Sequence, residues 1–247
     1  MIDEYHLSDF TRFNYRRLVR MAKSAYAFHR FTELREEKRF VLWRHDVDIS
    51  VHAARRLAEI EAEEGVTATY FLYIHSEFYN LFEAAIMQYV REIVSLGHDL
   101  ALHFNARLLN VRSVNELEVQ LTREKRMLED CFGQEILAFS FHNPDASSQT
   151  FRAQSYAGMV NAYSDYFVQE VAYVSDSNGY WRHRRLEDAL STASDPVLQV
   201  LTHPEWWQDI PMAPRARVER CINGRAEATR IAYDEHLASA GRKNVGA

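Results

Sequence analysis

The sequence contains little cysteine and no long hydrophobic run. Its two cysteines, Cys131 and Cys221, lie far apart and form no CxxC pair, which excludes a disulfide framework and a thiolate zinc site and is typical of a reducing compartment. No stretch approaches the roughly 20 apolar residues that a membrane span requires. The N-terminal MIDEYHLSDF lacks the apolar segment of a secretory signal. We therefore expect a cytoplasmic protein without a membrane span.

Positive charge is also in deficit, with 29 Lys and Arg against 35 Asp and Glu and a formal net charge of −6. This balance argues against a nucleic-acid partner. A hydrophobic share of 47% is ample for a core and argues against disorder. No Pro- or Gly-rich linker divides the chain, so we predict a single domain over residues 1–247. It would carry an N-terminal extension (1–37) and a C-terminal helix at about 213–239.

Short apolar runs alternate with longer amphipathic stretches. The runs predicted as strands are 39–44, 67–74, 99–104, 136–143, 170–177 and 197–203. The stretches predicted as helices between them include 50–65, 80–97 and 113–133. Nearly continuous apolar strands separated by helices predict a parallel sheet covered by helices, or a barrel.

Polar residues collect at the C-terminal end of each predicted strand. They are His45, Asp46, Asp48, His75, Glu77, His103, Asn105, His142, Asn143, Asp176, His203 and Glu205. In parallel α/β folds these strand ends form one rim, where active sites gather. Histidine and carboxylate without thiolate are the ligands of a catalytic zinc or related ion. The sequence therefore predicts a metal site on this rim.

Asp46 and Asp48 are two residues apart, so in an extended strand both side chains point to the same face. One of them could ligate the metal while the other accepts a proton from a bound water. The alternative is a structural pair at a strand end, capping a helix or paired with Arg44.

Six short motifs, taken in order, resemble those of polysaccharide deacetylases, the NodB-homology or carbohydrate esterase family 4 proteins. They are RHDVD (44–48), ATYFLY (68–73), GHDLALHF (97–104), SFHNP (140–144), YVSDSNGYWR (173–182) and LTHPEWW (201–207). The resemblance is greatest to the branch associated with O-antigen and other surface-polysaccharide biosynthesis. It implies an irregular α/β barrel of about six to seven parallel strands. It also implies an enzyme that uses a divalent metal, with zinc expected, to remove an acetyl group from an N-acetylated sugar.

The resemblance also implies roles for particular residues. Asp46 matches the general base, Asp48 and His103 match two metal ligands, and His203 matches the acid that protonates the leaving group. Trp181 and Arg182 resemble groups that shape the pocket.

One expected ligand is missing. The family carries a histidine or an aspartate four residues after its first histidine, where this chain has Arg107. Asn105 is a poor substitute because a neutral amide binds zinc weakly, so His142 is the preferred third ligand.

The remaining rim residues are expected to contact a carbohydrate substrate. They are His45, His75, Asn105, Asp176, Trp181, Arg182 and Trp206. Of the two EWWQ indoles, we expect one to stack on a sugar ring and the other to close the barrel. Two other functions stay open: a catalytically silent carbohydrate-binding protein on the same fold, favoured by the missing ligand, and a hydrolase of a different amide. The sequence gives no indication of the oligomeric state.

Overall fold

A mostly parallel sheet organises the chain in the computed structural model, which describes residues 4–33 and 39–246. Its strands are β1 (Ala27–His29), β2 (Phe40–Val47), β3 (Thr69–Leu72), β4 (Asp99–Phe104), β5 (Ala138–Phe141), β6 (Ser155–Tyr156), β7 (Met159–Asn161), β8 (Ala172–Ser175) and β9 (Val197–Thr202). The α-helices are α1 (Arg12–Ala25), α2 (Val51–Glu63), α3 (Ala84–Ser95), α4 (Val114–Phe132), α5 (Asp165–Gln169), α6 (Leu186–Thr192) and α7 (Pro214–Ser239). Short 3-10 turns are η1 (Leu7–Asp9), η2 (Ser148–Thr150), η3 (Ser177–Gly179) and η4 (Pro204–Trp206).

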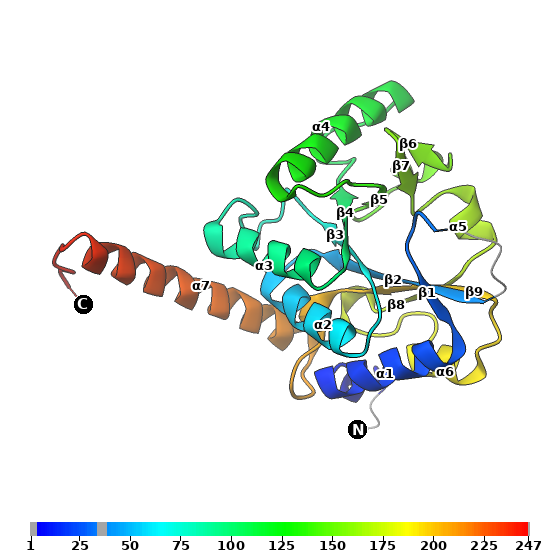
Figure 1. The fold of residues 1–247 in the computed structure, drawn as a ribbon, viewed down its shortest axis with the longest axis horizontal. Coiled ribbons are helices and arrows are strands. Elements are labelled where there is room, and N and C mark those ends of the chain that lie inside the picture. Colours follow the sequence, from blue (N-terminus) through cyan, green and yellow to red (C-terminus); the bar gives the residue numbers. More distant parts are fainter. Residues whose placement is uncertain (1–3, 34–38, 247) are drawn as a thin grey trace.

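The sheet runs in the order β6-β7-β5-β4-β3-β2-β9-β8, with β1 also paired to β2. Its pairs are parallel except for β6 with β7. The sheet curls into a half-barrel with helices on its outer face (Figure 1). The predicted α/β class is confirmed. The described residues form nine strands rather than six or seven, because the short strands β1, β6 and β7 carry little pattern.

Two helices begin and end where their sequences predict. Ser50 and Ser113 occupy the N-cap positions of α2 and α4, and each side chain accepts a hydrogen bond from the first turn. These bonds satisfy backbone N–H groups that have no partner within the helix. Gly133 ends α4 with φ of 63°, a left-handed conformation that glycine adopts without strain.

The described part of the predicted N-terminal extension belongs to the main sheet and core; residues 1–3 and 34–38 lie outside the described structure. Helix α1 buries Tyr15, Leu18, Val19 and Ala22, which share one helical face. Strand β1 pairs with the first half of β2. The four buried residues of α1 stand at i, i+3, i+4 and i+7, so the sequence carries a helical period for α1 that a search for continuous apolar runs misses.

The C-terminal helix α7 extends away from the sheet (Figure 1). Arg217 is its buried residue, and Arg225 forms an ion pair with Glu83 at the start of α3. Gly224 does not interrupt the helix. Among the described residues, no helix has the length and apolarity needed to cross a bilayer.

Candidate active site

The strand β2 carries two different faces along its whole length. Phe40 and Leu42 lie in a small apolar cluster on the concave side of the sheet, while Val41 and Trp43 join the larger core beneath the helices. Continuing this alternation past residue 43 places Arg44, Asp46 and Asp48 on the concave side. The run of charges therefore does not end the strand. It marks the point where the concave face changes from apolar to polar.

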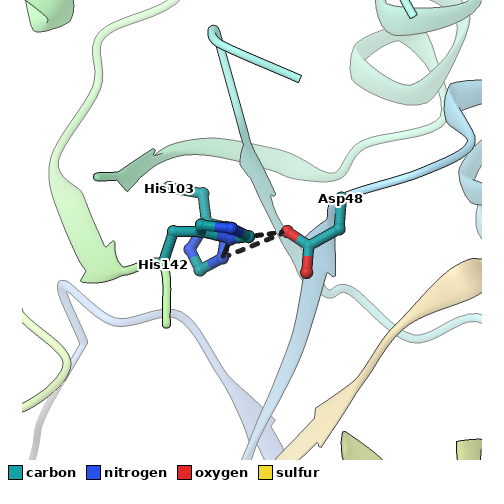
Figure 2. A group of neighbouring side chains, drawn as sticks. All are labelled: Asp48, His103 and His142. Carbon is teal, nitrogen blue, oxygen red and sulfur yellow. Dashed lines mark hydrogen bonds and ion pairs between the residues drawn. The ribbon is translucent and has the colours of Figure 1, made fainter. Parts of the chain in front are cut away.

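Asp48, His103 and His142 converge at the C-terminal edge of β2, β4 and β5. Oδ1 of Asp48 lies 3.2 Å from Nε2 of His103 and 3.2 Å from Nδ1 of His142, and the two nitrogens are 3.1 Å apart. Figure 2 shows both imidazoles turned toward the Asp48 carboxylate. Ligand atoms at zinc-bonding distance in a tetrahedral site lie roughly 3.3 Å apart. The three side chains therefore fit a divalent metal as they stand.

Neighbouring side chains orient both histidines. Nδ1 of His103 lies 2.7 Å from the hydroxyl of the buried Ser140, so a proton on Nδ1 leaves Nε2 free to ligate. The ring of Tyr73 stacks on His142 with centroids 4.2 Å apart. Nδ2 of Asn143 lies 2.9 Å from Nε2 of His142, and this contact further fixes the direction of the ring. Such outer partners fix the tautomer and the direction of a ligating imidazole.

The Asp48 carboxylate is held as an anion. Burial alone would raise its pKa, but the charge of His103 and hydrogen bonds from both imidazoles hold the pKa well below its ordinary value. The Ser76 hydroxyl donates to the Asp48 carbonyl, and the Tyr79 hydroxyl donates to the carbonyl of Val47. Asp48 thus has a fixed backbone and an ionised side chain, as a metal ligand requires.

Asp46 forms a buried ion pair with Arg44 of its own strand. Nε and Nη2 of Arg44 donate to the two carboxylate oxygens at 2.8 and 2.7 Å. The guanidinium also stacks 4.8 Å above the ring of Phe71. Burial raises the pKa of Asp46, but the charge of Arg44 and then that of His103 outweigh it and lower the pKa. Asp46 is therefore ionised and lies beside the group formed by Asp48, His103 and His142. Its Oδ2 is 3.6 Å from Nε2 of His103.

His203 faces the same group from the end of β9. Its Nδ1 donates to Oδ1 of Asp176 at 2.7 Å, its backbone N–H donates to the same carboxylate, and Trp207 Nε1 donates to Oδ2 at 3.0 Å. Nε2 of His203 is then directed toward Asp48, 3.9 Å from Oδ2. Burial opposes the charged imidazole, but the hydrogen bond and charge of Asp176 raise the pKa of His203 to about 10. His203 is thus a protonated group next to the metal ligands.

Glu205 is a second buried acid near His203 and a residue to which the motifs give no role. Its side chain is 1% exposed, and neither carboxylate oxygen has a hydrogen-bond partner among the described residues. Burial raises the pKa of Glu205 to about 8. A carboxyl group in this environment is mainly protonated at neutral pH, because the cost of burying its charged form outweighs the stabilising charge of His203.

Two predicted substrate contacts are buried as parts of other interactions. His45 is fully buried on the helix-covered face of β2, because it alternates with Arg44 and Asp46. Asp176 is also fully buried, and its carboxylate holds His203 and Trp207. The substrate-binding roles predicted for these two residues are therefore wrong, and Asp176 acts through His203.

The predicted aromatic and arginine contacts also lie elsewhere. Trp181 donates to Asp9 at 2.9 Å and stacks on Phe10, so it anchors the N-terminal segment. Trp206 is 7% exposed and packs within the core. Arg182 is exposed, and no contact joins it to the metal group among the described residues. None of these three side chains has the exposed, site-facing placement that the substrate-binding prediction requires.

His75 and Asn105 lie on the rim but outside the group formed by Asp48, His103 and His142. Nε2 of His75 pairs with Glu124 at 2.6 Å. Asn105 donates to the hydroxyl of Tyr73 at 2.8 Å and so supports the ring that stacks on His142. Arg107, which occupies the missing ligand position, is exposed. His142 joins Asp48 and His103 in a group that could hold a metal ion, whereas the side-chain amide of Asn105 donates to the Tyr73 hydroxyl.

Two residues of the site lie within the quoted motifs, although the sequence analysis assigned them no role. Ser140 precedes His142 by two residues on β5 and therefore shares its face of the sheet. Tyr73 directly follows β3 and reaches His142 across the sheet. Face alternation could have indicated Ser140, whereas Tyr73 becomes visible only when the strand order is known.

No protein-family model matches this chain, and no curated protein matches it either. Solved structures with similar folds include carbohydrate esterase family 4 proteins, as the motif order predicts. A pseudoenzyme of that family from Bacillus anthracis is 18% identical with a TM-score of 0.47, over 78% of this chain and 62% of its own. The peptidoglycan deacetylase of Bacillus subtilis is 13% identical with a TM-score of 0.46, over 83% and 98%.

The chitin deacetylase of Colletotrichum lindemuthianum is 14% identical with a TM-score of 0.45, over 75% of this chain and 81% of its own. This chain thus spans less than two thirds of the length of the Bacillus anthracis structure. Because these identities and scores are low, they assign no activity to this chain. What the site can do follows from its own side chains, which combine a potential metal triad, an ionised carboxylate and a protonated imidazole.

Proposed function

We propose that this chain is a metal-dependent hydrolase that removes an acetyl group from an N-acetylated sugar. One observation carries the proposal. The ligand atoms of Asp48, His103 and His142 lie within 4.8 Å of one another. Oδ2 of Asp46 is 3.6 Å from Nε2 of His103, and Nε2 of His203 is 3.9 Å from Oδ2 of Asp48. A metal triad flanked by an ionised carboxylate and a protonated imidazole is suited to hydrolysis of an amide.

The proposed metal ligands are Oδ1 of Asp48, Nε2 of His103 and Nδ1 of His142. One carboxylate and two imidazoles, with no fourth protein ligand, are typical of a catalytic zinc site that keeps an open position. A divalent ion bound there lowers the pKa of a water and polarises a carbonyl oxygen. The Ser140 hydroxyl holds the imidazole of His103 in the tautomer that this ligation requires.

Asp46 is proposed as the general base that accepts a proton from the attacking water. It borders the ligand set, and its lowered pKa keeps it ionised at neutral pH. A low pKa also makes a carboxylate a weak base, so Asp46 depends on being placed correctly beside the water. The two hydrogen bonds from Arg44 supply that placement.

His203 is proposed as the general acid. In the overall reaction, water adds to the acetyl carbonyl, the C–N bond breaks, acetate leaves and the sugar nitrogen takes a proton to become an amine. The proton on Nε2 of His203 faces the ligand set, while the Nδ1 proton is committed to Asp176. Transfer of a proton in the transition state contributes about 10² to 10⁴ in rate.

The substrate class rests on the motif order rather than on the metal triad, which would serve other amides equally well. By that resemblance, we place the reaction on an acetylated sugar used in O-antigen or other surface-polysaccharide biosynthesis, in the cytoplasm. His45, Trp181 and Trp206 are committed to internal contacts, so this proposal gives them no part in binding the sugar.

The test measures metal content and acetate release on the same preparations. Wild type is compared with Asp48→Ala, His103→Ala and His142→Ala, and the matched control is Asn105→Ala at the rejected ligand position. We expect near-stoichiometric divalent metal in wild type and in the control, and loss of metal and of acetate release in the other three variants. A panel of N-acetylated monosaccharides, nucleotide sugars and oligosaccharides identifies the substrate.

Each contrary result has a distinct meaning. A wild type that binds no metal after incubation with zinc would overturn the hydrolase and leave a carbohydrate-binding protein as the alternative. A metal-loaded wild type that releases acetate from no acetylated sugar, but hydrolyses a cyclic imide or ureide, would establish a hydrolase of a different amide. Metal retained in His142→Ala but lost in Asn105→Ala would reverse the assignment of the third ligand.

A further inference from the structure

The strand that carries the proposed base also holds a buried polar network on its other face. His45 lies between Arg44 and Asp46 in the sequence, but its fully buried ring points toward the helices. Both ring nitrogens have partners on other elements. Nε2 lies 2.6 Å from Oε1 of Glu61 on α2, and Nδ1 lies 2.7 Å from the hydroxyl of Thr202 on β9.

Glu61 fixes the tautomer of this ring. Burial would raise the pKa of Glu61, but the proximity of His45 and the hydrogen bonds it receives lower the pKa, so the carboxylate is ionised. It accepts from the hydroxyl of Tyr70 at 2.6 Å and from the hydroxyl of Tyr15. A carboxylate can only accept, so Nε2 of His45 must carry a proton. Nδ1 of the same ring forms the hydrogen bond with the Thr202 hydroxyl.

Thr202 directly precedes His203, and His45 directly precedes Asp46. The two residues are also opposite one another in the register of β2 and β9. One cross-strand hydrogen bond therefore joins the residue before the proposed base to the residue before the proposed acid. Because both partners are buried and hydrogen-bonded, a shift of either strand end would leave a buried polar group without a hydrogen bond, which is unfavourable.

We propose that His45 is a positioning residue that, through Thr202, sets the distance between Asp46 and His203. This inference rests on the proposed hydrolase function. The ring touches neither the ligand set nor the concave side of the sheet, and it acts by holding two strand ends in register. The Tyr70 contact with Glu61 lies on β3, away from β9, and it contributes to stability without bearing on that distance.

The test removes the cross-strand bond while preserving shape. Thr202→Val replaces the hydroxyl with a methyl group, and Thr202→Ser restores the hydroxyl. We expect Thr202→Val to lower kcat by about 10- to 100-fold with little change in KM, and Thr202→Ser to recover most of that loss. Tyr70→Phe is the matched control, because it removes one buried hydroxyl from the same network and should lower stability but not kcat. Metal content should stay constant in all three.

A second measurement does not depend on activity. Hydrogen–deuterium exchange of a peptide covering residues 198–206 should be faster in Thr202→Val than in wild type, Thr202→Ser or Tyr70→Phe. If wild type has no deacetylase activity, the proposed function fails, and the exchange result still decides whether this bond holds the end of β9. Equal kcat in Thr202→Val and wild type, or equal exchange in Thr202→Val and Tyr70→Phe, would overturn the positioning role.

Discussion

The guanidinium of Arg44 holds the carboxylate of Asp46 by two parallel hydrogen bonds of 2.8 and 2.7 Å between residues of a single strand. A lysine cannot reproduce this fork, because it offers one compact charge. We expect Arg44→Lys to lower kcat by at least about 10-fold while metal content is unchanged. Arg44→Met should also cost about 3–5 kcal/mol in unfolding free energy, because it leaves Asp46 buried without a partner.

Activity assays and urea denaturation check both statements. Arg56→Lys is the control, since its side chain is 46% exposed and should leave both quantities unchanged. A fully active Arg44→Lys enzyme would show that the fork does not position Asp46.

Removing the hydroxyl of Ser140 should weaken metal binding without removing a ligand. Its oxygen lies 2.7 Å from Nδ1 of His103 and fixes the tautomer that leaves Nε2 available. Loss of such an outer partner typically lowers metal affinity about 10- to 100-fold. Competition with a chromophoric chelator measures the affinity of Ser140→Ala. Ser95→Ala, at an exposed helix end, should bind metal as wild type does, and equal affinities in the two variants would contradict the orienting role.

Asp176→Asn should impair catalysis and spare metal binding. The asparagine keeps the size of the side chain but removes the charge that orients and protonates His203. We expect kcat to fall by about 10² to 10⁴, similar to His203→Ala, with metal content near that of wild type. Trp207→Phe removes the other side-chain donor to Asp176, and its effect should be smaller. A large loss of metal in Asp176→Asn would place Asp176 in the ligand set instead.

The buried carboxyl of Glu205 should make stability depend on pH. Burial raises its pKa from the ordinary 4.5 to about 8, so between these values the folded protein holds a proton that the unfolded chain has released. The unfolding free energy should therefore fall as pH rises from about 4.5 to about 8, by at most about 1.4 kcal/mol per pH unit from this group. Glu205→Gln removes that slope.

Urea denaturation of chelator-treated protein at several pH values gives the comparison. His203 titrates in both proteins, and Glu205 contributes to its raised pKa, so the difference between their curves reports Glu205 together with its effect on His203. We expect Glu205→Gln to gain stability relative to wild type as pH approaches 8. Parallel curves over this range would show that Glu205 titrates normally in the folded protein.

The positions of the longer strands and the candidate metal ligands could be predicted from the sequence, because both follow local patterns. Strand β4 begins and ends where its apolar run does, and the predicted ligands Asp48, His103 and His142 lie together. The residues at strand ends were predictable as a group, since parallel strands bring those ends to one edge.

The direction in which each rim residue points was harder to predict. His45 and Asp176 are polar residues at strand ends, and no composition rule distinguishes a group that faces substrate from one that supports a neighbour. Only the alternation along β2 separates His45 from Asp46, and the prediction of substrate contacts did not apply it. Trp181 and Trp206 depend on packing against Asp9, Phe10 and the start of α7, contacts between segments far apart in the chain.

The alternation of β2 also constrains how this protein can change over time. An insertion or deletion of one residue before Arg44 would exchange the two faces, placing Trp43 and Val47 in the cavity of the half-barrel and turning Asp46 and Asp48 into the core. Folding and chemistry would then be lost in a single event. Substitutions in the loops after the strands leave this frame intact, so changes in what the site binds can arise there, whereas β2 tolerates neither insertion nor deletion.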